Sequence, residues 1–443
     1  MAKNRSLSPP QAVVLGFLIL ILLGTVLLSL PQATASRNRQ PLVDALFTAT
    51  SAVCVTGLVV RDTGDYFSLF GQIVILLLIQ IGGLGYMTMA TFLLLLIGRT
   101  ITLRERLIMQ ESMPQFSLGG VVQFAKYVLK VTLVLEAAGA AILSLRWMGQ
   151  YPVPTAIYMG IFHSVSAFCN AGFALFSDSF TRFRGDMVIC LTVLCLFFIG
   201  GLGYVVLSDL YYFRYRKFPQ LSIHTKFVLS ITLVLIVLGG VAFFLLEYKN
   251  PSTLGGLPGR EKIMASLFQA MTPRTAGFSV INVGGMMQGS LFLTIILMFI
   301  GASPGGTGGG IKTTTFGVML ATVWATMRRR KDVTLFKHRI AEDVINKSFV
   351  VGFLSIFFIV IITVLITGGE SYKFIRVFFE TMSAFGTVGL STGITSGLSS
   401  LGKALLIVTM FVGRLGPLTI GVAMVREVKD LRFRYPEKKV LVG

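Results

Sequence analysis

The sequence contains little charge for its length. Of its 443 residues, 13% are Asp, Glu, Lys or Arg, whereas 54% are hydrophobic. An ordinary soluble domain has about 25% charged residues, which it needs to cover a surface that faces water. The composition therefore excludes a soluble cytosolic enzyme.

Cysteine and histidine are also scarce. The sequence has four Cys, all inside apolar segments, and three His. It has no Cys-x-x-Cys pair and no Cys/His cluster, so neither a disulfide framework nor a metal site is predicted. Paired carboxylates and a nucleophile–base set are missing as well. We therefore expect a protein that is not an enzyme and that binds no cofactor of its own.

Acidic residues are far fewer than basic ones, and the formal net charge is +20. Such an excess can indicate nucleic-acid binding. Here the Lys and Arg residues lie in short runs between long apolar stretches, which is typical of membrane topology. We expect a lipid bilayer as the surroundings and no nucleic-acid partner.

Apolar stretches long enough to cross a membrane recur along the chain. A spanning helix needs about 20 apolar residues. Eight candidates are present, and Glu136 and Arg414 are the single charges that interrupt two of them: residues 6–36, 66–98, 131–145, 187–208, 227–246, 275–311, 348–369 and 404–425. The apolar core of the first exceeds the 7–15 residues that are usual in a cleaved signal peptide, so we expect it to be retained. The sequence predicts an all-α polytopic membrane protein.

Basic residues predict the orientation, because loops on the cytoplasmic side are enriched in Lys and Arg. If the N-terminus is inside, the inner loops and tails hold most of the 39 Lys and Arg residues. We therefore expect both termini to be cytoplasmic. The basic run at 328–331 fits this topology, and binding to acidic lipid is the alternative interpretation. Lys312 and Arg414 are left at membrane depth.

One short pattern recurs four times, each time between two predicted spans. It consists of Phe, then Ser-Ala, then Gly at fixed distances, and its copies begin at Phe47, Phe162 and Phe379. The copy that begins at Leu267 keeps the glycine but loses the Ser-Ala pair. We call the final residues, Gly57, Gly172, Gly277 and Gly389, the hairpin glycines.

This repetition predicts four units, each made of a helix, a re-entrant hairpin and a second helix. We place them at residues 1–110, 111–219, 220–339 and 340–443. The third unit has a broken second helix, and the fourth includes a cytoplasmic C-terminal tail. The fold class that we predict is thus four helix–re-entrant pore loop–helix repeats around a pseudo-fourfold central pore.

The first limb of each hairpin is predicted to be a short helix. Pro41 and Pro154 stand near two of the starts, where a missing N–H is harmless. A helix of about 13 residues is roughly 20 Å long, which reaches the middle of the membrane without crossing it. The chain then returns in an extended form, and such backbone is tolerated at this depth only where it lines a cavity.

Four returning segments around one axis would place a ring of carbonyl oxygens there. Such a ring replaces the hydration shell of a monovalent cation, and the negative ends of four short helices favour a cation at the centre. The residues predicted to bind the ion form a selectivity filter: Val55, Thr56, Gly57, Asn170, Ala171, Gly172, Thr275, Ala276, Gly277, Thr387, Val388 and Gly389.

A second repeated motif lies in the second helix of each unit. Gly-Gly-Leu-Gly stands at 82–85 and at 200–203, and Gly-Arg-Leu-Gly at 413–416. Close helix packing is the plain interpretation of the first two copies. Arg414 places a charge in the membrane, which costs about 2.5–3.5 kcal/mol. It either faces the pore below the ring or bridges to a carboxylate such as Glu380.

The third copy departs from the motif and has several glycines together with Pro304. We expect residues 302–316 to be a loop, because glycine and proline both disfavour a helix interior. We call this segment the glycine-rich loop; it is either a gate beneath the pore or a passive kink. It is not a phosphate-binding loop, since Ile311 stands where that motif needs a glycine before Lys312. The gating residues that we predict are Ala302, Ser303, Gly305, Gly306, Thr307, Gly308, Gly309, Gly310, Lys312 and Arg414.

Four such units, one glycine per hairpin and the sequence Gly-Arg-Leu-Gly-Pro-Leu-Thr at 413–419 resemble the Trk/Ktr/HKT superfamily of potassium transporters. The resemblance covers nearly the whole chain and is greatest to the Ktr membrane subunits. It implies potassium uptake across a bacterial cell membrane, with K+ bound at the four hairpin glycines. Family members with serine at the first position tend to prefer sodium, so glycine at all four positions favours potassium.

The resemblance also implies partners. These are a second copy in a homodimer and a cytoplasmic ring of KtrA-type subunits that bind ATP or ADP and regulate the gate. Activation by sodium, or symport with it, is common among such systems, although no residue of this sequence establishes it.

The alternative function is an ion-coupled secondary transporter of a small solute. Discontinuous helices also occur in that class, usually with twofold inverted repeats. The four copies in this chain share one orientation, which favours the pore.

Overall fold

The computed structural model describes residues 9–85, 120–213 and 221–424, and most of these residues are in helices. Within them, the strands form one small antiparallel pair, β1 (Thr334–Leu335) with β2 (His338–Arg339). The helices fall into four successive groups of similar order: α1 (Pro9–Leu28), α2 (Leu42–Val53) and α3 (Leu69–Leu84); α6 (Gly120–Trp147), α7 (Val153–Phe168), α8 (Met187–Leu202) and α9 (Tyr204–Phe213); α10 (Ile223–Glu247), α11 (Gly259–Met271), α12 (Gln288–Phe299) and α13 (Thr313–Met327); α14 (Glu342–Gly369), α15 (Phe374–Gly386), α16 (Ser400–Leu415) and α17 (Pro417–Met424).

Each group begins with a long helix, followed by a short helix, a return segment and a second helix. The short helices α2, α7, α11 and α15 contain 12, 16, 13 and 13 residues. Pro41 is the N-cap of α2, and Pro154 lies in the first turn of α7. The predicted repeat of helix, half-length helix and second helix is therefore confirmed. The predicted boundaries near residues 110 and 219 fall outside the described residues.

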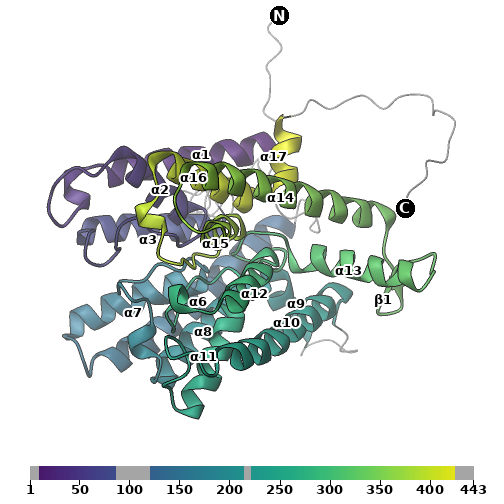
Figure 1. Ribbon diagram of the computed structural model, residues 1–443, viewed down its shortest axis with the longest axis horizontal. Coiled ribbons are helices and arrows are strands. Elements are labelled where there is room, and N and C mark those ends of the chain that lie inside the picture. The colour runs from purple at the N-terminus through teal and green to yellow at the C-terminus, as the bar shows by residue number, and fades with distance from the viewer. Residues whose placement is uncertain (1–8, 86–119, 214–220, 425–443) are drawn as a thin grey trace, which may run out of the picture.

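The four groups close into a ring. The second helix of each group packs against the short helix of the next, in the pairs α3 with α7, α8 with α11, and α12 with α15. The last contact joins α16 of the fourth group to α2 of the first, and Figure 1 shows these two ends of the chain side by side. This cyclic packing gives the pseudo-fourfold arrangement that the repeat predicted.

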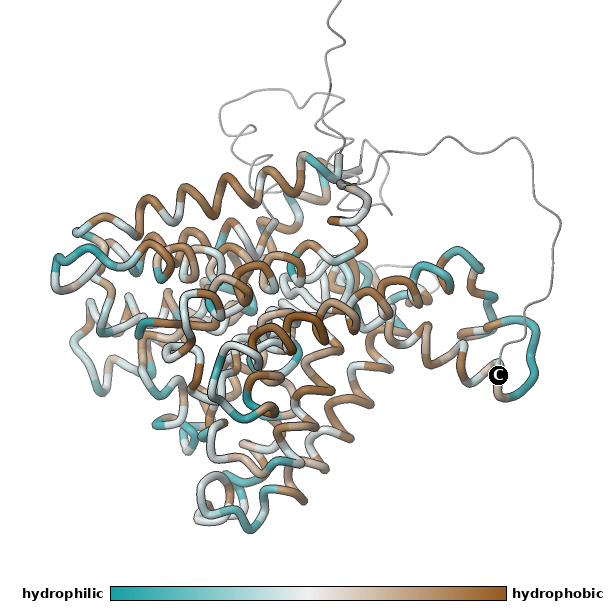
Figure 2. The backbone as a smooth tube through the Cα atoms, turned by 45° about the horizontal axis from the view of Figure 1, so that its top comes forward, coloured by the Kyte–Doolittle hydropathy of each residue, from teal (hydrophilic) through white to brown (hydrophobic). Residues whose placement is uncertain are grey.

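The long helices α1, α6, α10 and α14 are each apolar enough and long enough to cross a membrane. Apolar side chains such as Leu245 on α10 and Phe353 on α14 are exposed on the surface. Figure 2 shows apolar residues along these helices and polar residues at their ends and in the connections. Such a surface is stable against hydrocarbon, as expected of a polytopic membrane protein.

In the described residues, the second helices of three groups end inside the predicted spans 66–98, 187–208 and 404–425. α3, α8 and α16 end where Gly85, Gly203 and Gly416 adopt φ values of 80°, 92° and 86°. A residue with positive φ cannot continue a right-handed helix, and glycine adopts this conformation without a steric penalty. After Gly203 the chain turns by 97° into α9. In the third group the break is longer, with residues 300–312 between α12 and α13.

The first glycine of each motif has another role. A Cβ atom on Gly82, Gly200 or Gly413 would overlap the carbonyl oxygen of Val53, Phe168 or Phe385, respectively, near the end of the short helix. The second helix therefore lies directly against the short helix at these three places, and the close-packing interpretation is confirmed.

We expect Gly200→Ala to destabilise the protein by about 1–3 kcal/mol, the usual penalty for overpacking, because the new methyl group would overlap the Phe168 carbonyl oxygen. The measurement is the thermal unfolding midpoint of the detergent-solubilised protein. Gly368→Ala is the control, because a Cβ there has no atom within 4 Å. Equal midpoints for both variants would contradict this packing.

Candidate functional site

The four hairpin glycines meet in a closed ring. Their φ values are 87°, 68°, 76° and 92° in chain order, all in the region that favours glycine. A Cβ on Gly57 would lie 3.0 Å from Cα of Gly172, and one on Gly172 would lie 3.0 Å from Cα of Gly277. The corresponding distances are 3.3 Å from Gly277 to Gly389 and 3.1 Å from Gly389 back to Gly57. No side chain fits inside this ring.

The residues before the glycines share one strained conformation. Two positions before each glycine stand Val55, Asn170, Thr275 and Thr387, with φ values of 57°, 58°, 69° and 49°. A non-glycine residue in this region costs on the order of 1–3 kcal/mol, and such strain persists only where the surroundings impose it. Because all four repeats adopt it, the strain is a property of the ring rather than of one sequence.

Hydroxyl groups from the short helices hold the ring backbone. The N–H groups of Gly57 and Gly389 donate to Oγ of Ser51 and Ser383, each over 3.1 Å. In the second repeat, Ser166 Oγ donates to the carbonyl oxygen of Phe173 over 2.7 Å. These residues are the serines of the repeated Ser-Ala pair, whose role the sequence analysis had not identified.

The third repeat lacks that pair, and the hydroxyl group of the residue at the next position takes its place. Thr272 Oγ1 donates to the carbonyl oxygen of Phe278 over 2.6 Å. Phe278 follows Gly277 just as Phe173 follows Gly172. A hydroxyl therefore supports the hairpin backbone in all four repeats.

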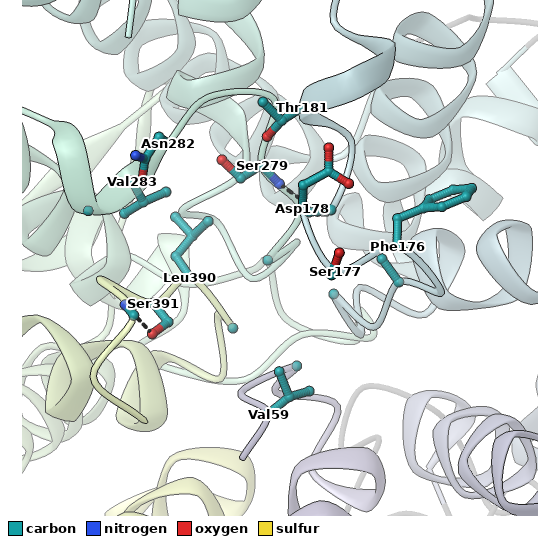
Figure 3. A pocket seen from close by; sticks show the side chains of 18 of the residues that line it. Val59, Phe176, Ser177, Asp178, Thr181, Ser279, Asn282, Val283, Leu390 and Ser391 are labelled. Carbon is teal, nitrogen blue, oxygen red and sulfur yellow. Dashed lines mark hydrogen bonds between the residues drawn. The ribbon is translucent and has the colours of Figure 1, made fainter. Parts of the chain in front are cut away.

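A cavity of about 400 Å³ opens on one side of the ring. Its wall comes from all four repeats and includes the hairpin glycines and the residues that follow them, such as Val59, Ser177, Ser279 and Leu390 (Figure 3). The carboxylates of Asp62 and Asp178 also belong to this wall.

The two acidic residues of the cavity wall have local partners. Asp62 accepts hydrogen bonds from the N–H groups of Gly64 and Asp65. Asp178 accepts one from Arg182 over 2.7 Å, and this bond raises the pKa of the Arg182 guanidinium. Because Arg182 offsets the charge of Asp178, Asp62 is the carboxylate of this wall that favours cations in the cavity.

The glycine-rich loop lies on the other side of the ring. It spans residues 300–312, shorter than predicted, because α13 already begins at Thr313. The N–H of Gly309 donates to Thr387 Oγ1 over 2.9 Å, and Gly308 packs against the side chain of Thr275. Asn170 Nδ2 donates to Thr275 Oγ1 over 3.1 Å. The loop therefore touches the strained residues of the ring directly.

The broken second helices hold the loop in place. A helix end leaves backbone groups without intrahelical partners. The Ser303 and Gly310 N–H groups donate to the carbonyl oxygens of Gly201 and Gly413, each over 3.1 Å. In return, Tyr204 N–H donates to the carbonyl oxygen of Gly305 over 3.0 Å. The backbone N–H and C=O groups of the loop and of the helix ends thus form hydrogen bonds with each other.

Three further contacts hold the loop, one within it and two from the first residue of α13. Lys312 Nζ donates to the Gly308 carbonyl oxygen over 2.8 Å. Thr313 N–H donates to the Ala302 carbonyl oxygen over 3.3 Å, next to a hydroxyl contact of 3.2 Å between Thr313 and Ser303. The loop is therefore an ordered structure in this conformation.

Arg414 lies at the same level and binds backbone groups. Its guanidinium donates from Nη1 to the carbonyl oxygen of Thr307 and from Nη2 to that of Gly82. The alternative interpretation, a bridge to Glu380, was wrong, because that carboxylate accepts its hydrogen bonds from residues 391, 392 and 395 instead. Arg414 therefore ties α16 to the loop and to the end of α3.

The structure brings every predicted filter and gating residue into one assembly, with the ring on one side and the loop on the other. Among the described residues, no three His, Cys, Asp or Glu side chains are grouped as metal ligands. The ring brings backbone carbonyl oxygens of all four repeats close to the hairpin glycines, and the loop lies against the residues before those glycines.

Two relatives match this chain over nearly its full length. It is 43% identical to Ktr system potassium uptake protein B of Bacillus subtilis, over 98% of this chain and 97% of that protein. It is 41% identical to the protein of the same name from Vibrio alginolyticus, over 98% and 95% of the two chains.

The fold matches the crystal structure of the potassium transporter TrkH from Vibrio parahaemolyticus with a TM-score of 0.72, at 20% sequence identity. That match covers 96% of this chain and 86% of the other, and it shows that the fold is shared. Residues 9–430 also match the TrkH family model, which is described as a cation transport protein. The chain is therefore a member of the TrkH family of cation transport proteins.

Proposed function

We propose that this chain is the membrane subunit of a bacterial potassium uptake system and that potassium crosses it through the ring of hairpin glycines. The observation that carries the proposal is the closed ring itself, to which each of four repeats contributes one glycine at positive φ. The relatives at 43% and 41% identity are both potassium uptake proteins by name.

The filter in this proposal is made of backbone. The carbonyl oxygens of Thr56, Ala171, Ala276 and Val388 each adjoin the hairpin glycine of a neighbouring repeat. Such a ring of carbonyl dipoles replaces the water around a desolvated monovalent cation. The four short helices end three to six residues before their glycines, so their negative ends add to the attraction.

The gate in this proposal is the glycine-rich loop together with Arg414. The loop lies against the ring and so occupies the path that an ion would take. Arg414 adds a positive charge at that level, which opposes a cation in a site of low dielectric constant. Opening requires the loop to release its bonds to the ring and to the broken helices.

The proposed regulator is a cytoplasmic ring of KtrA-type subunits that bind ATP or ADP, acting on a homodimer of this chain with both termini in the cytoplasm. α13 runs from the glycine-rich loop to the exposed basic run at 328–331 and the strand pair. Figure 1 shows α13 and β1 projecting from the body of the protein. A partner that binds there would pull on the loop through α13. Activation by sodium is an expectation that rests on the family resemblance alone.

The direct test is uptake of radioactive rubidium, a potassium analogue, into liposomes that contain the purified protein. We expect uptake that excess external potassium blocks and that sodium at the same concentration affects far less. A flux that depends on an added solute, without rubidium uptake, would favour the secondary transporter instead.

Gly57→Ser should reduce discrimination between potassium and sodium at least ~10-fold, which corresponds to about 1.4 kcal/mol. The serine Cβ would overlap the Ala171 carbonyl oxygen and distort the ring. Gly393→Ser is the matched control, because Gly393 also has positive φ and lines the cavity, yet a Cβ there meets no atom within 4 Å. The measurement is sodium competition with rubidium uptake. Equal selectivity in both variants would disprove the filter assignment.

Deleting residues 306–309 should raise rubidium uptake several-fold in the absence of any partner. The deletion removes the loop's bonds to Gly200 and Thr387 and the carbonyl group that accepts from Arg414. Ile300 and Ile311 pair as neighbours, so the shortened loop still closes. The rate of uptake into liposomes is the measurement, and an unchanged rate would mean that the loop is not a gate.

A further inference from the structure

Behind the ring, one position of the short helices carries a different side chain in each repeat. The residues nine positions before the hairpin glycines are Thr48, His163, Phe268 and Glu380. All four are buried, with at most 2% of their surface exposed. The backbone conformation of the ring repeats four times, whereas the side chain that lies behind it at this position differs in each repeat.

Glu380 ties its short helix to the return segment. Its Oε1 accepts hydrogen bonds from Thr392 N–H over 2.8 Å, from Thr392 Oγ1 over 3.1 Å and from Ser391 Oγ over 2.8 Å. Its Oε2 accepts one from Thr395 Oγ1 over 2.7 Å. These three donor residues follow Gly389, so the carboxylate fixes the chain just beyond the ring.

His163 makes the equivalent tie in the second repeat. Its Nε2 lies 3.1 Å from the N–H of Leu175, and its Nδ1 lies 2.8 Å from the carbonyl oxygen of Met159. The donor at one nitrogen and the acceptor at the other require the neutral tautomer with the proton on Nδ1. Leu175 follows Gly172 by the same three positions as Thr392 follows Gly389.

Packing also fixes the His163 ring. The ring of Phe176 stacks on it at 4.9 Å, and those of Trp147 and Phe180 contact it edge to face at 5.2 and 5.3 Å. The imidazole therefore has one orientation in which it can accept the Leu175 N–H.

At this position the other two repeats have no such tie among the described residues, although in the first repeat Arg61 of the return segment donates to Asp44 of the short helix over 2.9 Å. The hydroxyl of Thr48 donates to the Asp44 carbonyl oxygen of its own helix over 2.9 Å. Phe268 has no polar atom and contacts Phe197 edge to face. The ring order places Gly172 and Gly389 on opposite sides, since each adjoins both Gly57 and Gly277. The two ties therefore lie at the two ends of one diagonal.

We propose that His163 and Glu380 are positioning residues that fix this diagonal of the filter and thereby set its discrimination against sodium. The inference rests on the proposed function. A carbonyl ring excludes a smaller cation only if the carbonyl groups cannot close in around it, and the balance of cavity size and flexibility decides this. Ties from a buried helix to the backbone beyond the ring limit that closing along the diagonal on which they act.

The test compares variants at this position in all four repeats by sodium competition with rubidium uptake into liposomes. We expect Glu380→Ala and His163→Leu to lower potassium-over-sodium discrimination about tenfold or more. Thr48→Val and Phe268→Leu are matched controls with equal burial and no tie to remove, and they should keep the selectivity of the unmodified protein. Glu380→Gln keeps one acceptor oxygen for the Thr392 N–H and should give an intermediate value.

The outcomes separate positioning from plain stability. Variants with a lower unfolding midpoint and slower uptake but unchanged selectivity would show a purely structural role and overturn the inference. Glu380→Gln and Thr395→Val, which removes one hydrogen bond, provide the measurement if the larger changes prevent folding. An unmodified protein that takes up rubidium selectively, with all variants equally selective, refutes the inference alone. An unmodified protein without selective uptake refutes the proposed function as well.

Discussion

Backbone polar groups inside a membrane must find partners, and this constraint explains the centre of the molecule. The ring, the glycine-rich loop and three helix breaks all expose N–H and C=O groups at membrane depth. Many of these groups are hydrogen-bonded to one another. Carbonyl oxygens at the ends of α8 and α16 accept hydrogen bonds from N–H groups of the loop, and Arg414 donates to the carbonyl oxygens of Thr307 and Gly82. In the first and fourth repeats, the ring N–H groups donate to serine hydroxyl groups of the short helices. The need to hydrogen-bond every backbone group usually favours unbroken helices in a membrane. In this protein, several interrupted helices meet that need together.

The backbone around the ring is similar in all four repeats, whereas the side chains that support it differ. Each repeat contributes a glycine with positive φ and, two positions before it, a residue in the same strained conformation. The third repeat adds the loop, the fourth adds Arg414, and the second and fourth add ties behind the ring. The asymmetry therefore resides in the loop, Arg414 and these ties, and not in the backbone of the ring.

Much of this could be predicted from the sequence because the signals were local and repeated. The composition required a membrane, four glycines at matched positions required hairpins, and Pro304 with its neighbouring glycines required a break. The helix ends at Gly85, Gly203 and Gly416 were missed, because glycines around a leucine are equally compatible with close packing of a continuous helix. The Ser51 and Ser383 hydroxyls were noted as a pattern, but their targets lie in backbone geometry that the pattern does not contain.

The sequence by itself determined the membrane environment, the number of repeats and the identity of the residues at the ring and in the loop. These features follow from hydrophobicity and from the spacing of residues, both of which depend only on the order of residues along the chain. Only the tertiary structure decided the partners of Arg414, Glu380 and His163, and the contact between loop and ring. The physical reason is that a buried charge or ring nitrogen takes whichever group folding brings within hydrogen-bond distance. That group can lie hundreds of positions away, as Gly82 does from Arg414.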